Sequence, residues 1–192
     1  MFGYHENMPI TSFADRAAGL RAAMSQLGRD IAGQASGMAA DELFELTGHL
    51  QGVVNAAEGT QVLVAAHAAS HETRLTSRGP VEVHHEVGFV DAMAPSEVAL
   101  ATGTTVGVAG SRVQLGADLA ERFPRLLEAV VSGVVTTGSA RRVVTACEGL
   151  DAASCALVEE VLVGRLPELD PARVATVARR VAARIEIGRA HV

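Results

Sequence analysis

The sequence predicts an all-α protein, a multi-helix bundle in which one long N-terminal helix precedes a C-terminal array of short helices. Apolar residues make up 48% of the 192 positions, which is enough to form a buried core. Aromatic residues supply only 3% and tryptophan is absent, so alanine and valine provide most of the apolar content. Such a composition favours closely packed helices over a sheet sandwich. Apolar residues recur at steps of three and four, and we find no convincing strand alternation.

Two helices are expected in the N-terminal part of the chain. The first begins after Thr11 or Ser12, since either side chain can cap a helix, and it runs to about Gln34. The second is longer and runs from about Ala40 to Leu75, with acidic residues in its first turn, where the helix dipole favours negative charge.

The second helix carries a heptad-like apolar stripe from Leu43 to His71. Such a stripe is typical of the contact surface of an antiparallel helix pair or bundle. Gly48, Gly52 and Gly59 lie off the stripe and permit the close approach of a neighbouring helix. The stripe consists of Leu43, Leu46, Leu50, Val53, Ala57, Thr60, Val64, His67 and His71.

A loop and a series of short helices follow. The loop is expected at 77–85, with a short extended piece at 81–83 and a short helix at 86–93. Thr105 and Asp151 are in position to cap later helices. The short helices of the array are expected at 95–102, 106–120, 124–132, 139–147, 152–165 and 171–185.

Charge is distributed unevenly along the chain. The net charge is −6, and all 16 basic residues are arginine. Residues 1–96 contain 5 arginines and 11 acidic residues, whereas residues 97–192 contain 11 of each. The overall acidity argues against a general nucleic-acid coat, but local arginine clusters in the neutral second half can meet phosphate. In the last expected helix, Arg173, Arg180 and Arg184 share a face apart from the apolar residues.

Several features indicate a cytoplasmic location without membrane insertion. No apolar run reaches the roughly 18–20 residues of a spanning helix. The N-terminus has no basic region followed by an apolar stretch, so no secretory signal is expected. Cys147 and Cys155 are too few for a disulfide framework and are expected to be buried thiols in a reducing compartment, with a redox pair as the alternative.

The segment from Glu97 to Val113 has the pattern of a helix-turn-helix. Ala99 and Gly103 are four residues apart, which provides a small residue for a close helix crossing and a glycine for a left-handed turn. If this motif contacts DNA, Thr104, Thr105 and Arg112 face phosphate or bases. The alternative is a helical hairpin without a nucleic-acid role.

The segment from Leu115 to Val144 is more distinctive. It contains Phe-Pro, then Leu-Leu-Glu-Ala-Val-Val-Ser-Gly, then Val-Val-Thr-Thr-Gly-Ser-Ala-Arg, and near the end of the chain follows Leu-Pro-Glu-Leu-Asp-Pro-Ala-Arg-Val. In order and spacing these motifs resemble those of domain of unknown function 222. The resemblance covers about residues 41–185 and is strongest over 88–185.

That resemblance implies a helical accessory domain. The family is found mainly in high-GC Gram-positive bacteria, usually N-terminal to an HNH endonuclease module. Such a module is a metal-dependent nuclease, so a divalent cation is expected there and no cofactor in this chain. We find no HNH module here, and no catalytic residue carries over.

The last residues are expected to be foreign to the natural gene. Residues 187–192, Ile-Gly-Arg-Ala-His-Val, resemble a sequencing-library adapter translated in frame, and the preceding Glu186 fits the same string. We therefore expect a flexible N-terminus at 1–10, a helical domain at 11–185 and an adapter-derived segment at 186–192, which makes the chain a fragment.

The remaining candidate residues support two functions of different classes. Arg141 and Arg142 follow Ser139 at a helix start and either contact phosphate, together with Arg112, or form a solvated face with ion pairs. The first function is therefore DNA engagement beside an HNH module. The second is a protein-interaction scaffold, a homodimer through the Leu43–His71 stripe. A histidine metal site is not expected, because the helical pair His67 and His71 continues the stripe.

Overall fold

The computed structural model describes residues 12–190, so the predicted flexible segment 1–10, Thr11 and the last two residues lie outside the described part. The chain divides into two compact units, Met1–Gly48 and His49–Val192. Apart from one β-hairpin, the regular elements of the described residues are helices, which confirms the predicted fold class in the main. None of the described helices is long and apolar enough to traverse a lipid bilayer.

The first unit contains α1, Phe13–Gln34, and the start of α2, Ala40–Ala69, with a short 3-10 turn, Ala35–Gly37, between them. Ser12 caps α1 as predicted. Its hydroxyl accepts from the Asp15 backbone N–H at 3.1 Å, and the Asp15 carboxylate accepts in return from the Ser12 N–H at 3.2 Å. This reciprocal capping explains why the sequence located the beginning of α1 correctly.

The buried face of α2 is not the predicted stripe. In the second unit, Val53 and Val64 are 46% and 60% exposed, whereas a face of small residues is buried. Gly59 contacts the backbone of Val130 so closely that a Cβ would lie 2.2 Å from its carbonyl oxygen. Two backbones this close leave room only for small side chains such as those of glycine and alanine. The face of α2 that is buried is therefore determined by small residue size and not by the apolar stripe. That face consists of Gly59, Val62, Ala65, Ala66 and Ala69.

A β-hairpin, β1 (His71–Thr76) and β2 (Gly79–His84), lies where we predicted the end of the long helix and a loop. The extended piece predicted at 81–83 is confirmed, because it lies within β2. The predicted helix end at Leu75 is therefore wrong, because α2 stops at Ala69. The buried Ser70 ends it: its hydroxyl donates to the His67 carbonyl at 2.7 Å, and its own carbonyl accepts from the His85 N–H at 2.8 Å. Most hairpin residues are exposed, so no polar–apolar alternation marked the strands.

The short helix predicted at 86–93 does not form. Gly88 has φ +126°, which interrupts any helix there, and Val87 and Phe89 form an isolated bridge instead. The Asp91 N–H donates to the Ala69 carbonyl at 2.9 Å, so this segment folds back onto the end of α2.

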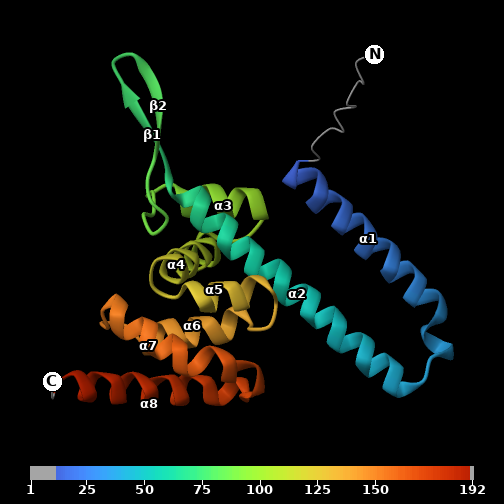
Figure 1. Ribbon diagram of the computed structural model, residues 1–192. Helices are drawn as coiled ribbons and strands as arrows, with labels where there is room; N and C mark the ends of the chain where they lie inside the picture. Colours follow the sequence, from blue (N-terminus) through green and yellow to red (C-terminus); the bar gives the residue numbers. More distant parts are fainter. Residues whose placement is uncertain (1–11, 191–192) are drawn as a thin grey trace, which may run out of the picture. The chain divides into compact units, whose positions relative to one another are not determined.

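The remaining helices agree with the predicted array within a few residues at each end. Thr105, Thr136 and Asp151 each cap a following helix through the side-chain oxygen. The last helix continues past Ile185 to Ala190. Within the second unit, the hairpin and the last helix lie at opposite ends of the array (Figure 1). The elements are α3 (Ala94–Thr102), α4 (Val106–Arg122), α5 (Pro124–Val131), α6 (Thr137–Ala146), α7 (Ala152–Leu162), the 3-10 turn η2 (Val163–Glu168) and α8 (Pro171–Ala190).

The main core of the second unit forms between α4 and α8. Phe123 and Leu119 are fully buried at its centre, where they join Val158 and Val174 from the last two helices. Cys147 and Cys155 are also fully buried and are free thiols, which confirms their predicted burial. Burial, and to a smaller extent the neighbouring Cys155, raises the pKa of the Cys147 thiol to about 11.

Candidate nucleic-acid interface

Helices α3 and α4, joined by a tight turn, form the segment for which a helix-turn-helix or a helical hairpin was predicted. Gly103 ends α3 in the left-handed conformation with φ +65°, and the Thr104 N–H donates to the Ala99 carbonyl at 3.1 Å. Ala99 is 6% exposed and Ala109 is fully buried, so the two small residues allow the helices to pack closely. The predicted spacing therefore produced a tight helical hairpin.

The exposed start of α4 is apolar. Thr105 uses its hydroxyl to cap the helix by accepting from the Val108 N–H, and the Thr104 hydroxyl lies 2.9 Å from that of Thr102. Val106 and Val108 are 54% and 51% exposed beside them. The two candidate threonines thus have local structural roles, and the exposed side chains beside them carry no charge.

Arg112 lies further along α4, about 10 Å from Thr105 at 1.5 Å rise per residue. It lines a small hollow of about 120 Å³ together with Arg141 and Thr137 from α6 and Glu58 from α2. Thr137 donates to the Glu58 carboxylate at 3.0 Å, while Arg112 Nη1 is buried and has no hydrogen-bond partner among the described residues. The structure thus brings Arg112 and Arg141 together and leaves one guanidinium nitrogen without a described acceptor.

Helix α6 presents two arginines and contains no acidic residue. Ala140, Val143 and Val144 are buried on its inner side, so Arg141 and Arg142 are exposed on the other. Arg141 Nη1 donates to the Ser111 carbonyl of α4 at 3.2 Å, which holds this side chain between the two helices.

A larger hollow of about 340 Å³ lies between α6 and α8. Arg141 and Arg142 line it from one helix and Arg179 from the other, together with Thr145, Ala146 and Ala175. The sequence pattern did not indicate Arg179, because this residue lies neither on the apolar face of α8 nor on the face shared by Arg173, Arg180 and Arg184. The adjacent pair Arg179 and Arg180 could have indicated a positively charged site from the sequence. Only the packing of α6 against α8 shows that Arg179, and not Arg180, lines the same hollow as Arg141.

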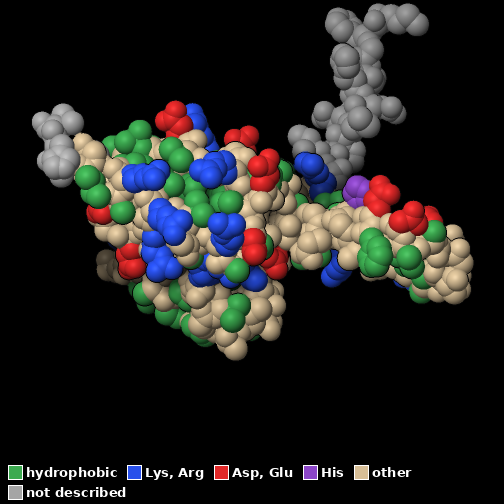
Figure 2. Space-filling model, turned by 90° about the horizontal axis from the view of Figure 1, so that it is seen from below, with side chains coloured by type: hydrophobic (Ala, Val, Ile, Leu, Met, Phe, Trp, Pro, Cys, Tyr) green, Lys and Arg blue, Asp and Glu red, His purple; other side chains and the backbone are tan. Residues whose placement is uncertain are grey.

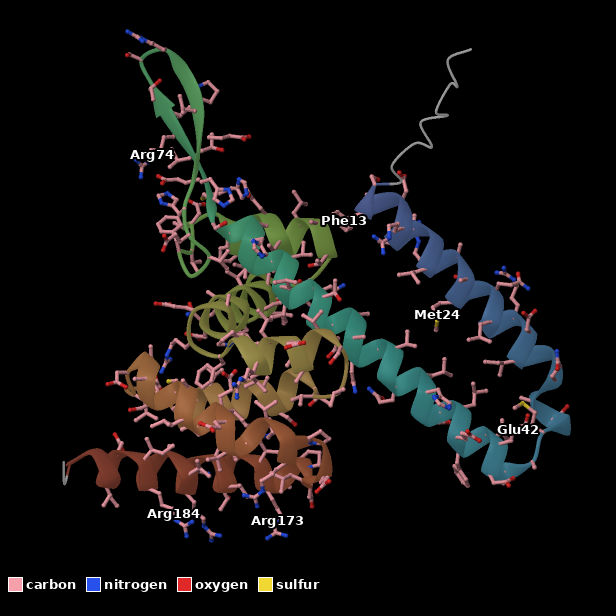
Figure 3. The ribbon with its side chains drawn as sticks, in the orientation of Figure 1. Phe13, Met24, Glu42, Arg74, Arg173 and Arg184 are labelled. Carbon is pink, nitrogen blue, oxygen red and sulfur yellow. The ribbon has the colours of Figure 1, made fainter. Side chains whose placement is uncertain are left out.

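The outward side of α8 carries more arginine. Arg173 and Arg184 point away from the helical array (Figure 3), and arginine side chains gather on the face seen from below, with acidic groups nearer its edge (Figure 2). Within the described part of the chain, no carboxylate forms an ion pair with any of these arginines. We call this surface the α6–α8 arginine face. It consists of six exposed residues, Arg141, Arg142, Arg173, Arg179, Arg180 and Arg184.

Three of the described histidines, His71, His84 and His85, lie in the hairpin or directly after it. His71 lies in β1 and not on the helix with His67, so the four-residue helical spacing considered for a metal does not exist. His71 meets His84 edge to face at 4.3 Å, and His85 Nε2 lies 2.8 Å from the Glu72 carboxylate. Hydrogen bonds from Arg74 and then His85 lower the pKa of Glu72 to about 2. Among residues 12–190, no three histidine, cysteine or acidic side chains are grouped as metal ligands.

Comparison with known proteins yields one family. The family described as Domain of unknown function (DUF222) matches residues 49–188. The matched range covers the second unit up to residue 188, including α3 and α4, both hollows and the α6–α8 arginine face. No curated protein and no solved structure matches the chain.

Proposed function

Because the chain belongs to the DUF222 family, we propose that it is a non-catalytic, cytoplasmic accessory domain that binds DNA beside an HNH endonuclease module. The observation that carries this proposal is the α6–α8 arginine face. Six exposed arginines without a described carboxylate partner lie on two packed helices of a chain whose net charge is −6. Guanidinium groups without a carboxylate partner keep their donors available for phosphate oxygens.

The chemistry of arginine suits a phosphate backbone. The guanidinium group stays charged at any physiological pH and presents a planar fork of donors that matches phosphate oxygens. Segregation of the charges supports binding despite the negative total, because charges beyond about 8–10 Å are largely screened at physiological salt. Contacts of this kind position a domain on DNA and do not specify sequence, so binding is expected to be largely independent of sequence.

The first test is a binding measurement on the complete chain. Fluorescence anisotropy with a labelled DNA duplex at low salt is expected to show binding, and Arg141→Ala combined with Arg142→Ala is expected to weaken it by about 10-fold or more, since two phosphate contacts are lost. The matched control is Arg16→Ala combined with Arg21→Ala on α1, which removes the same charge from exposed positions. Absence of binding by the unaltered chain, or an equal loss in the control, would contradict the proposal.

A second candidate function is homodimerisation through α2. The specific observation in its favour is the exposure of valines on this helix: Val53 is 46%, Val54 is 47% and Val64 is 60% exposed. The predicted stripe reached His71, which lies in the hairpin, so only its α2 portion is available. Light scattering is expected to give twice the chain mass for this candidate, and Val64→Asp is expected to return the mass to that of one chain. A single-chain mass that dilution does not change would reject it.

A further inference from the structure

The hollow between α6 and α8 concentrates positive charge in a concave site. Three arginines, Arg141, Arg142 and Arg179, line a volume of about 340 Å³. Its other lining residues are Thr145, Ala146 and Ala175, so it has no acidic side chain in its wall. A volume of this size is at the lower end of the range for small-molecule sites. It therefore suits a phosphate group with an attached sugar better than a bare ion.

Two of the three arginines are already held in place by hydrogen bonds. Arg179 Nε donates to the Ala175 carbonyl of its own helix at 3.2 Å, which leaves its two Nη groups available. Arg141 is anchored through Nη1 to the Ser111 carbonyl. The guanidinium group of Arg142 lies beside Gly138 in the first turn of α6. Its Nη1 is 3.4 Å from the position that a Cβ on Gly138 would occupy. Side chains that are ordered before binding lose less conformational entropy when a ligand arrives.

The charge of the site distinguishes two kinds of phosphate. A phosphodiester inside a strand carries one negative charge and continues in both directions. A terminal phosphomonoester carries about −1.5 to −2 at neutral pH, has three free oxygens and continues in only one direction. Three arginines around one hollow match a terminal phosphomonoester better than a phosphodiester. The terminal phosphate can enter the hollow with its three free oxygens first, while the rest of the strand stays outside.

We infer that the hollow between α6 and α8 binds the terminal phosphate of a DNA strand. Arg142 and Arg179 supply guanidinium donors from two helices, and Arg141 adds charge at the rim. Ala146 and Ala175 provide a small apolar wall against which a sugar packs. This inference rests on the proposed function for the identity of the strand, whereas the phosphate site itself depends only on the hollow and its arginines.

The test compares two duplexes of the same sequence, one with 5′-phosphate ends and one with 5′-hydroxyl ends, on the complete chain. The phosphorylated duplex is expected to bind about 10-fold more tightly, and Arg179→Ala is expected to reduce that ratio to about one. The matched control is Arg184→Ala, an exposed arginine on the same helix that does not line the hollow. It is expected to weaken both duplexes equally and to keep the ratio.

A second variant tests whether the effect of Arg179→Ala comes from the lost phosphate contact or from a loss of stability. Ala175→Glu places a carboxylate in the hollow without removing any arginine and is also expected to abolish the preference for phosphorylated ends. Thermal unfolding followed by circular dichroism confirms that each variant is folded. Equal affinity of the unaltered chain for both duplexes would overturn the inference and leave DNA binding intact.

The outcome in which neither duplex binds separates the two proposals. That result would overturn the proposed function, and a 5′-deoxymononucleotide then tests the hollow alone. A change in the phosphorus NMR signal of the mononucleotide with the unaltered chain, absent with Arg179→Ala, would support the phosphate site. No change with either protein would overturn it.

Discussion

Replacing Gly59 by alanine is expected to lower the free energy of unfolding by about 3 kcal/mol or more, the upper range for inserting a methyl group into a closely packed contact. A Cβ at this position would lie 2.2 Å from the carbonyl oxygen of Val130 and 2.6 Å from its carbonyl carbon. Both atoms belong to the backbone of α5, so no rotamer change can relieve the contact. Either α2 or α5 has to move, and the small-residue face of α2 separates from the core.

Gly52→Ala is the matched control on the same helix. A Cβ at Gly52 meets no atom within 4 Å, so the substitution gains helix propensity without a clash. It is expected to raise the free energy of unfolding by about 0.5–1 kcal/mol. Chemical denaturation monitored by circular dichroism measures both variants. If Gly59→Ala proved as stable as the unaltered chain, the close packing of α2 on α5 would be wrong.

Replacing Glu159 by alanine is expected to cost about 2–4 kcal/mol, because buried backbone donors lose their acceptor and a cavity is left. Helix α5 begins at Pro124 without a side-chain cap of its own. Glu159, 3% exposed on α7, replaces that cap: its Oε1 accepts from the Leu126 N–H at 2.6 Å. One carboxylate therefore joins the start of α5 to α7 across the core.

The same carboxylate makes stability depend on pH. Burial raises the pKa of Glu159 above its ordinary value of 4.5, although hydrogen bonds from the backbone of Leu126 and Arg125 oppose the shift. The folded state then binds more protons than the unfolded state, so this contribution to stability declines as pH rises from about 4.5 through the folded pKa. Glu159→Gln has no titratable group at this position, so it lacks this part of the pH dependence of stability. The contributions of all other titratable groups cancel when the two proteins are compared.

Guanidinium denaturation at acidic and neutral pH measures this effect. The stability of the unaltered chain minus that of Glu159→Gln is expected to be greatest near pH 4.5 and to decrease toward neutral pH. A difference that grows with pH would show that the native carboxylate is stabilised in its charged form and would contradict the pKa direction.

Local capping signals explain why most helices were predicted correctly from sequence. Ser12, Thr105 and Asp151 lie immediately before helices that they cap, so each boundary depends on neighbours within three residues. Of the hairpin only the extended piece at 81–83, which lies within β2, was predicted, and the rest was missed for the opposite reason. Its strands are largely exposed, and the bond that fixes its base joins Ser70 to His85, 15 residues away.

The candidate interface was only partly predictable, because some of its residues are brought together by contacts between helices that are distant in sequence. Arg141 and Arg142 are adjacent and follow a helix start, so their exposure could be expected from the pattern of buried residues around them. Arg179 joins them only because α6 packs on α8, and the anchoring of Arg141 by Ser111 requires α4 as a third helix. The stripe does not mark the buried face of α2, because periodicity locates apolar residues but does not show where a close backbone approach demands glycine.

The salt dependence of DNA binding tests the central claim most directly. If the six residues of the α6–α8 arginine face contact phosphates, the logarithm of the binding constant should fall against the logarithm of salt concentration with a slope of about −5. In Arg141→Ala combined with Arg142→Ala the slope should become shallower by about 2. An affinity that does not change with salt, or an unchanged slope in that variant, would contradict the proposed role of this face.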